Sequence, residues 1–310
     1  MSLNDKAIFS AFKSQTFPGS VRRNALLLAA ALALSIIAFN LHRSIRSLPP
    51  ICPPYESKPS RIVSLSLGTD ELLVDLVRPE RIAALTYLAV NPEFSNVADR
   101  ARLLPRHTAG SVEEVARLRP DLILATTFNN PEKVESLRAL GCEVVTVSGF
   151  DSLDGIRNTA LKVAAAVGES RRGSELVDRM DRTLREAARS RDEGKDRPRV
   201  LFAGPGGYSQ GGGTTVNDLI HRAGGVNVAA EMLSGIGRLS AEEWLSLKPD
   251  VLLRISFTPL DPFLIELFQA VGRKYGPREV VMPSRLLTSI SPSSARAVRV
   301  LADKLKGAAR

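Results

Sequence analysis

The sequence predicts an α/β protein of two similar parallel-sheet lobes, which are joined by a long interlobe helix and have a ligand cleft between them. Three observations carry this prediction. Short apolar runs alternate with amphipathic segments from Arg61 onward, which is typical of parallel strands covered by helices on both faces. One sequence block occurs twice, 129 residues apart. Between the two copies, residues 152–191 keep a helical period and have no strand pattern.

The first 47 residues are expected to form a signal peptide or a signal anchor with basic flanks. Residues 25–39 read ALLLAAALALSIIAF and follow a basic segment that ends in Arg22 and Arg23. This uncharged run is at the upper limit for a signal peptide and is shorter than the ~20 residues that cross a bilayer. Cleavage near Ala38 would release the protein into the periplasm, whereas an uncleaved segment, residues 25–41, would anchor it to the inner membrane. A buried core helix is the third interpretation, which the lack of helical periodicity disfavours.

A proline-rich linker, residues 48–60, is expected to precede the N-terminal α/β lobe, residues 61–150. Strands of this lobe are expected at Arg61–Ser66, Arg81–Thr86, Asp121–Ala125 and Cys142–Ser148. Helices are expected at Thr69–Val77, Ser111–Leu118 and Pro131–Leu140. Thr69 is a candidate N-cap of the first helix, because its hydroxyl can accept a hydrogen bond from the first turn.

The interlobe helical segment, residues 151–197, is expected to contain two helices. Leu176, Met180 and Leu184 keep a helical spacing, and Gly168 and Gly173 are expected to break the stretch. The second helix would have about 20 residues and a length of roughly 30 Å, which is enough to pass from one lobe to the other.

The C-terminal α/β lobe, residues 198–310, repeats the alternation. Strands are expected at Arg199–Gly204, Asp250–Ile255 and Val280–Met282, and helices at Thr215–Ala223, Ser240–Leu247 and Ser291–Gly307. The loop GPGGYSQGGG, residues 204–213, fits neither glycine-rich phosphate motif. Its glycines indicate either a close approach of backbone to a ligand or a mobile surface loop.

The repeated block reads SVEEVARLRPDLIL at residues 111–124 and SAEEWLSLKPDVLL at residues 240–253. Each copy predicts an N-cap serine, two acids in the first turn of an amphipathic helix, a Pro-Asp turn and a buried strand. The helix dipole favours acids at this end of a helix, which is one explanation for them. Their recurrence at the same place in both halves indicates duplication of a half-domain.

Composition and cysteine spacing restrict the partners. The formal charge is +9, but the basic residues are spread along the chain and aromatics are only 5%, so no nucleic-acid partner is expected. Cys52 and Cys142 lack the paired spacing of a zinc site, and the three histidines join no metal-ligand cluster. Cys142 is interpreted as a buried free thiol, and a Cys52–Cys142 bridge in an oxidising compartment is the open alternative.

The chain resembles the periplasmic substrate-binding proteins of ABC importers for iron-siderophores, haem and cobalamin. The resemblance covers roughly Arg61 to Lys306 and rests on RIVSLSLGTDELLVDL, both copies of the repeated block and GTTVNDLIHRAGGVNVAAE. It implies two α/β lobes joined by one long helix, with the ligand in the cleft. It also implies that one acid on each lobe engages arginines of the permease. By position these are Glu113 and Glu242, and the neighbouring alternatives are Glu114 and Glu243.

Ligands of open α/β sheets bind beyond the carboxyl ends of the strands. In the first lobe this rule selects Leu67, Gly68, Thr69, Tyr87, Thr127, Phe128 and Asn129. In the second lobe it selects Gly206, Gly207, Tyr208, Arg254, Phe257, Ser284 and Arg285. The aromatic residues, with Trp244 as a further candidate, suit a corrinoid, whereas Arg254 and Arg285 suit an anionic ferric siderophore.

We therefore expect an exported solute-binding protein, and not an enzyme, that captures a metal chelate and delivers it to the permease subunits of an ABC importer. The chelate is a cobalamin-type corrinoid or a ferric siderophore, so the ligand carries the cobalt or iron and the protein needs no cofactor of its own. The protein is expected to be a monomer. One alternative is a haem receptor of the same type. Tyr87 or Tyr208 could then ligate the iron, although apolar packing against the ligand is the favoured role of either tyrosine. The other alternative is a membrane-tethered sensor or an enzyme that reuses the fold, although no catalytic Ser/His/Asp set is recognisable.

Overall fold

The computed structural model describes residues 34, 35, 37, 58–189, 197–256 and 262–308. The chain divides into two units, residues 1–50 and 51–310, and the fold that follows is that of the second. The predicted signal segment apart from its three described residues, the linker up to residue 57, and Phe257 lie outside the described ranges. Within those ranges, no helix is long and apolar enough to span a bilayer.

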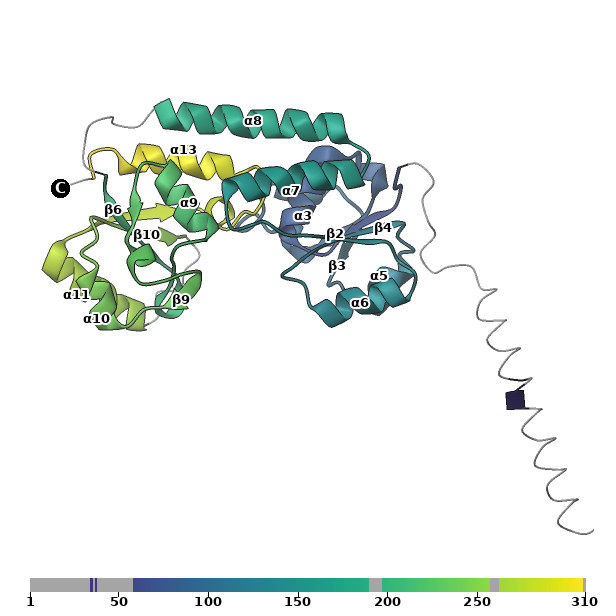
Figure 1. Cartoon of the computed structure of the whole chain (residues 1–310), viewed down its shortest axis with the longest axis horizontal. Helices are drawn as coiled ribbons and strands as arrows, with labels where there is room; N and C mark the ends of the chain where they lie inside the picture. Colours follow the sequence, from purple (N-terminus) through teal and green to yellow (C-terminus); the bar gives the residue numbers. More distant parts are fainter. Residues whose placement is uncertain (1–33, 36, 38–57, 190–196, 257–261, 309–310) are drawn as a thin grey trace, which may run out of the picture. The chain divides into compact units, whose positions relative to one another are not determined.

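The first lobe contains a five-stranded parallel sheet in the order β3-β2-β1-β4-β5 (Figure 1). Its strands are β1 (Ile62–Ser64), β2 (Ile82–Thr86), β3 (His107–Thr108), β4 (Leu122–Thr126) and β5 (Val144–Val147). Its helices are α3 (Leu67–Leu76), α4 (Ala98–Ala101), α5 (Val112–Arg117) and α6 (Pro131–Ala139), with 3-10 turns η1 (Pro79–Arg81) and η2 (Tyr87–Val90). The prediction of an α/β lobe with a parallel sheet is confirmed.

Alternation along the strands buries both faces of this sheet. Ile62 and Leu122 belong to a core that also includes residues of α3 and α7 (Leu153–Ala166). The neighbouring Val63 and Ile123 belong to a second core, against α5 and α6. Successive side chains of a strand point to opposite faces, so continuous apolar runs are what a sheet covered on both faces requires.

The prediction that Thr69 caps the first helix is wrong, because α3 begins two residues earlier. Ser66 is the N-cap: its backbone is extended, and its Oγ accepts a hydrogen bond from the backbone N of Thr69 at 3.4 Å. Thr69 is fully buried, and its hydroxyl lies 2.7 Å from Ser64 Oγ and 2.9 Å from Ser66 Oγ.

The second lobe contains a four-stranded parallel sheet in the order β11-β10-β6-β8, and an antiparallel pair, β7 and β9. The strands are β6 (Arg199–Ala203), β7 (Tyr208–Gln210), β8 (Val226–Asn227), β9 (Ile236–Arg238), β10 (Val251–Ile255) and β11 (Arg278–Met282). The helices are α9 (Thr215–Arg222), α10 (Ala241–Ser246), α11 (Pro262–Tyr275), α12 (Ser284–Leu287) and α13 (Ser294–Leu305), with 3-10 turns η3 (Pro205–Gly207) and η4 (Val228–Glu231). Neither α11 nor the β7–β9 pair is predicted by the sequence pattern.

The interlobe segment consists of α7 and α8 (Ser170–Arg189), and α8 has the predicted 20 residues. The break between them includes Gly168, whose φ of +70° favours glycine. Gly173 lies inside α8, so the prediction that it breaks the helix is wrong. A Cβ at Gly173 would lie 2.3 Å from Cβ of Ala164, so this glycine instead lets α8 approach α7 closely.

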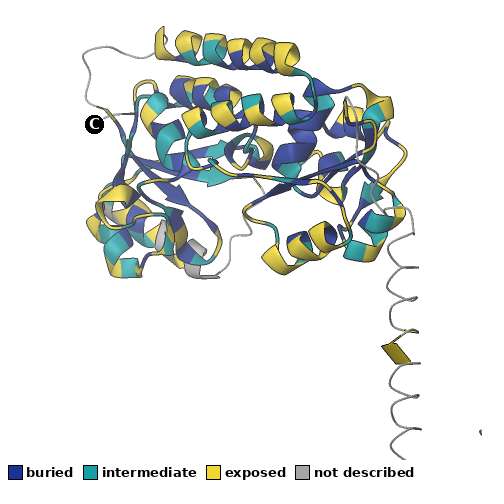
Figure 2. Cartoon of the chain, turned by 45° about the vertical axis from the view of Figure 1, so that its right-hand side comes forward, coloured by how far each residue is buried: buried dark blue, intermediate teal, exposed yellow. Residues whose placement is uncertain are grey.

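A helical layer joins the two lobes. α8 packs along α7 and α13 and also contacts α3, and Figure 1 shows it running beside these helices. The larger hydrophobic core is continuous through this layer, from Leu72 of α3 through Met180 of α8 to Leu301 of α13. Figure 2 shows the sheets buried beneath the helices, whose outer faces are exposed.

A buried carboxylate on α3 also ties the lobes together. Glu71 is 1% exposed, and its carboxylate accepts hydrogen bonds from the backbone N of Asn96 at 2.8 Å and from Oγ of Ser289 at 2.9 Å. It also accepts one from Oγ of Ser291. Because the two serines lie between α12 (Ser284–Leu287) and α13 (Ser294–Leu305), Glu71 binds the segment that leads into α13 to the first lobe.

Asp70, beside Glu71, is fully buried and accepts hydrogen bonds from N and Oγ1 of Thr86, at 3.1 and 2.5 Å. Burial raises the pKa of Asp70 from 3.8 to about 6, against the opposing effect of the hydrogen bonds. Since the folded-state pKa lies above the unfolded value, the folded state holds the proton more tightly. The stability from this site is complete below the unfolded pKa and is lost as the pH rises through about 6.

We expect Asp70→Asn to remove this pH dependence. Between pH 5 and pH 7.5, the free energy of unfolding of the wild type should fall by about 1 kcal/mol relative to the variant. Urea denaturation at both pH values measures the difference. If wild type and variant respond to pH in parallel, Asp70 does not titrate in this window.

Candidate functional site

The two copies of the repeated block have the same local structure. Ser111 Oγ accepts a hydrogen bond from the backbone N of Glu114 at 3.2 Å, and Ser240 Oγ accepts one from N of Glu243 at 3.3 Å. Each serine therefore caps its helix as predicted. The carboxylates of Glu114 and Glu243 fold back onto backbone N–H groups, of Ala109 at 3.2 Å and of Ser240 at 2.7 Å.

The Pro-Asp turn of each copy anchors the first strand of its lobe. The residue before the proline is left-handed in both copies, with φ of 47° at Arg119 and 45° at Lys248. In the first copy, the Arg61 side chain donates a hydrogen bond to the carbonyl of Arg119, and Asp121 accepts one from the backbone N of Arg61. In the second copy, Arg199 makes the same two hydrogen bonds, with Lys248 and Asp250. The conformational match supports a duplicated half-domain.

This geometry distinguishes the two acids of each pair. Glu114 and Glu243 are partly buried and serve their own helix, whereas Glu113 and Glu242 are exposed. Within the described part of the chain, the carboxylates of Glu113 and Glu242 make no hydrogen bond or ion pair. One free carboxylate therefore lies at the same position on each lobe.

Apolar side chains are exposed at the carboxyl edge of the first sheet. Tyr87 and Leu88, directly after β2, are 58% and 49% exposed, and Phe128, after β4, is 72% exposed. The ring centroid of Phe128 lies 5.7 Å from that of buried Phe150, which holds one side of the ring in place. Thr127 is also exposed.

The carboxyl edge of the second sheet has a similar character. Tyr208, at the start of β7, is 51% exposed, and Ile236 of the paired strand β9 is 69% exposed. Gly206 and Gly207 before Tyr208 have φ of 65° and 80°, so the turn from β6 into β7 requires residues that tolerate the left-handed region. Exposed apolar side chains gathered at such an edge are typical of a binding surface.

Three predicted ligand residues of the first lobe have structural contacts of their own. Gly68 is buried against Ile290, and Thr69 belongs to the cap of α3. The amide of Asn129 accepts from the backbone N of Thr126 at 2.7 Å and donates to the carbonyl of Leu65 at 2.8 Å, so it fastens the end of β4 to β1. Leu67 is partly exposed.

Glu93, which the sequence analysis did not select, brings the two strand edges together. It lies in the loop after η2, and its Oε1 accepts hydrogen bonds from Oγ of Ser256 at 2.6 Å and of Ser284 at 3.0 Å. Ser256 directly follows β10. The hydroxyl of Ser256, followed by that of Ser284, lowers the pKa of Glu93, which keeps the carboxylate ionised. The chain that follows β2 is thus within hydrogen-bond reach of the chain that follows β10.

The two predicted cationic ligand residues are engaged within the protein. Arg254 forms an ion pair with Glu279 on β11, and its side chain is 19% exposed. Arg285 is exposed and donates to the carbonyl of Pro92 at 3.3 Å, while its own carbonyl accepts from Asn96 Nδ2 at 2.7 Å.

Trp244, His107 and Cys142 are each engaged within the protein. Trp244 is fully buried in the core beneath α10, so the suggestion that it contacts a ligand is wrong. The Nε2 of His107 lies 3.1 Å from the carbonyl O of Ala101. Cys142 is disulfide-bonded, so the free-thiol interpretation is wrong; the only other cysteine, Cys52, lies outside the described residues. No cluster of His, Cys, Asp or Glu suited to a metal ion occurs in the described ranges.

Two α/β lobes, a joining helical layer and exposed apolar residues at both carboxyl edges define a two-lobed solute-binding architecture. The chain belongs to the periplasmic binding protein family, whose sequence model matches residues 62–262. The expectation of a binding protein rather than an enzyme is therefore confirmed by the family.

The chain is similar to a cobalamin-binding protein of Halobacterium salinarum, with 28% identity over 205 residues, or 64% of this chain and 54% of the relative. The chain thus matches about half the length of that relative. Among solved structures, it is similar to the periplasmic haem-binding protein RhuT of Roseiflexus sp. RS-1, with a TM-score of 0.69, 24% identity and coverage of 82% of this chain and 100% of the other. The vitamin B12-binding protein BtuF of Vibrio cholerae is similar with a TM-score of 0.63, 19% identity and coverage of 81% and 98%.

Proposed function

We propose that this chain is an exported solute-binding protein that captures a cobalamin-type corrinoid between its lobes and delivers it to the permease of an ABC importer. The observation that carries the proposal is the set of exposed apolar side chains at the carboxyl edges of both sheets, Tyr87 and Phe128 on one lobe and Tyr208 and Ile236 on the other. A large macrocycle with apolar faces suits such a surface. The cobalamin-binding relative supports the same ligand class.

The polar groups favour a corrinoid over the other predicted ligand, a ferric siderophore. An anionic siderophore requires free cationic side chains. Arg254 is already paired with Glu279, so of the two predicted cationic side chains only Arg285, which is exposed and donates one hydrogen bond to the Pro92 carbonyl, is left to meet an anion. The Glu93 carboxylate at the junction would repel an anion.

The disulfide at Cys142 supports export, because disulfides persist in oxidising compartments and are rare in the cytosol. Export agrees with the basic and apolar N-terminal sequence, whether that segment is cleaved or retained as an anchor. Glu113 and Glu242 are the acids proposed to meet arginines of the permease. The chain is proposed to act as a monomer.

Titration calorimetry of the full chain with cyanocobalamin, a ferric hydroxamate siderophore and haemin tests the ligand. We expect one cyanocobalamin site with a Kd below about 1 μM and no detectable heat from the siderophore. Siderophore binding without cobalamin binding would replace the ligand assignment. Binding of none of the three would refute the proposal of a metal-chelate receptor.

Haem is the second candidate ligand, because both Tyr87 and Tyr208 present exposed side chains where an iron ligand would be needed. Tyrosine is an established axial ligand of haem iron. If haem is the physiological ligand, Tyr87→Phe or Tyr208→Phe should remove the phenolate-to-iron absorption band and weaken haemin binding by about tenfold or more. Cobalamin binding should change little, since phenylalanine keeps the apolar ring.

Tyr275→Phe is the matched control for the haem test, because Tyr275 lies on α11 and packs against the core beneath α10. It should bind haemin as the wild type does. Unchanged haemin spectra in both Tyr87→Phe and Tyr208→Phe would exclude tyrosine ligation.

A further inference from the structure

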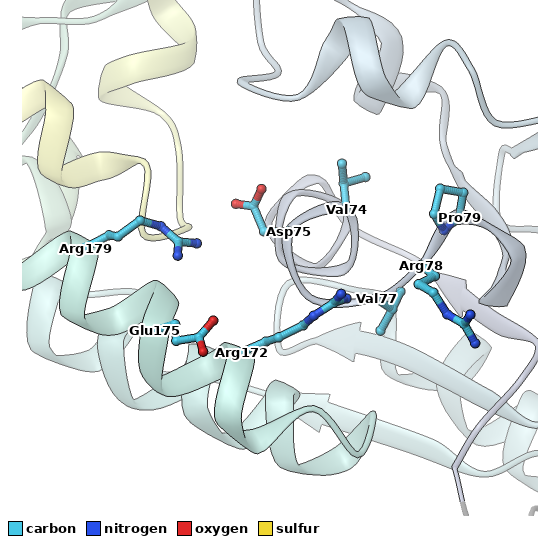
Figure 3. Close-up of a pocket in the computed structure, with 8 residues that line it drawn as sticks. All are labelled: Val74, Asp75, Val77, Arg78, Pro79, Arg172, Glu175 and Arg179. Carbon is cyan, nitrogen blue, oxygen red and sulfur yellow. The ribbon is translucent and has the colours of Figure 1, made fainter.

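A groove follows the helical layer where α3, α8 and α13 meet. It consists of two hollows, of about 360 and 280 Å³, which share Asp75 and Arg179. The first lies between α3 and α8, and Figure 3 shows Arg172 and Arg179 extending from α8 toward α3. The second reaches Arg296 on α13.

The groove is separate from the proposed chelate site. α3 begins at the carboxyl edge of the first sheet, directly after β1, and ends at the amino edge, before β2. The groove is lined by the last turns of α3 and the residues just after it, Val74 to Pro79. The aromatic residues proposed for the chelate, such as Tyr87 and Phe128, line neither hollow.

Positive charge dominates the walls of the groove. Five arginines line it, against two acids. Both acids already have partners: Asp75 lies 2.5 Å from Arg100, and Glu175 lies 3.1 Å from Arg171. The groove therefore has more guanidinium groups than its own carboxylates neutralise.

Three of these arginines have no partner in the part of the chain that the structure describes. Among the described residues, the guanidinium groups of Arg78, Arg179 and Arg296 make no hydrogen bond or ion pair. Arg172 donates one hydrogen bond, to the carbonyl of Leu76 at 2.9 Å, and keeps its other donors. Several like charges along one concave surface raise the local concentration of anions.

We infer that this groove binds an oxyanion of the phosphate class. A guanidinium offers parallel N–H donors that match two oxygens of a phosphate, and Arg179 can supply them at the point that both hollows share. The second hollow is also lined by Leu176 and Met180, which are buried in the core. Free phosphate and the headgroup of an anionic phospholipid present the same chemistry to this surface.

Two arms of one experiment distinguish these sources. Calorimetry of the full chain with inorganic phosphate tests the free anion, and flotation with phosphatidylglycerol vesicles, compared with phosphatidylcholine vesicles, tests the headgroup. The variant is Arg179→Glu, and the matched control is Arg182→Glu, which makes the same charge change on the same helix at an exposed residue outside the groove. Arg296→Glu is the second variant, and the melting temperature of each verifies folding.

Anion binding by the wild type is expected in one arm, and it should weaken by about tenfold or more in Arg179→Glu and Arg296→Glu. The Arg182→Glu control should stay within about twofold, and ~0.5 M NaCl should weaken all binding. Binding of phosphate identifies the free anion, and binding only of phosphatidylglycerol vesicles identifies the headgroup. No binding in either arm, or equal losses in variants and control, would overturn the inference. Cyanocobalamin affinity should be unchanged in all three variants, so this result is independent of the chelate proposal.

Discussion

Replacing Glu113 and Glu242 together with alanine is expected to abolish uptake of the ligand while leaving its affinity for the isolated protein unchanged. Both acids are exposed, lie at equivalent positions on the two lobes and have no partner among the described residues. Loss of one buried Arg–carboxylate pair from an interface costs about 2–5 kcal/mol, so docking should weaken on the order of 100-fold or more. Uptake of labelled ligand by cells that produce the protein and its permease measures the effect.

The matched control replaces the neighbouring acids, Glu114 and Glu243, with alanine. These carboxylates accept backbone hydrogen bonds at the start of their own helices. Their loss should lower the free energy of unfolding by about 1 kcal/mol per site and leave uptake intact. Normal uptake by the Glu113→Ala/Glu242→Ala protein, or loss of its ligand affinity, would show that the docking roles are wrong.

Glu71→Ala is expected to have the largest effect on stability, lowering the free energy of unfolding by about 3–5 kcal/mol. The substitution removes the buried acceptor of the Asn96 amide and of the Ser289 and Ser291 hydroxyls. Water does not take the place of the lost carboxylate at these donors, since both serines are buried. Urea denaturation measures the loss.

Asp75→Ala is the control on the same helix, one turn further on. Asp75 makes an ion pair with Arg100, whose side chain is 54% exposed, so its loss should cost no more than about 1 kcal/mol. If Glu71→Ala also costs less than about 1 kcal/mol, the carboxylate does not hold the segment before α13 to the first lobe.

Local patterns predicted most of the fold because each pattern has a local cause. Strands of four or five residues, such as β2 and β4, appear as apolar runs, and the 20 residues of α8 keep a helical period. Two-residue β3 and the three-residue pair β7 and β9 are too short to show an alternation, and they depend on their partner strands. Sequence reasoning therefore missed them.

The candidate site was predictable only in part, because only some of its features have a local cause in the sequence. Repetition identified both Glu-Glu pairs, but only the three-dimensional contacts separate the capping acid from the free one. Glu93 and Glu71 escaped notice because their serine partners lie 163 and 218 residues away in the chain. Hydrogen bonds across such separations leave no periodic or spacing signal. The exposed Tyr87 and Tyr208 were selected because they follow strands, which is a local feature.

Hydrogen–deuterium exchange with and without saturating cyanocobalamin tests the central claim, that the chelate is held between the carboxyl edges of both lobes. The amides of η2, Tyr87–Val90, and of β7, Tyr208–Gln210, should exchange more slowly in the same complex. The C-terminal end of α3, at the opposite edge of the first sheet, should be unaffected. Protection confined to one lobe, or protection at the end of α3 instead, would contradict a binding site between the two edges.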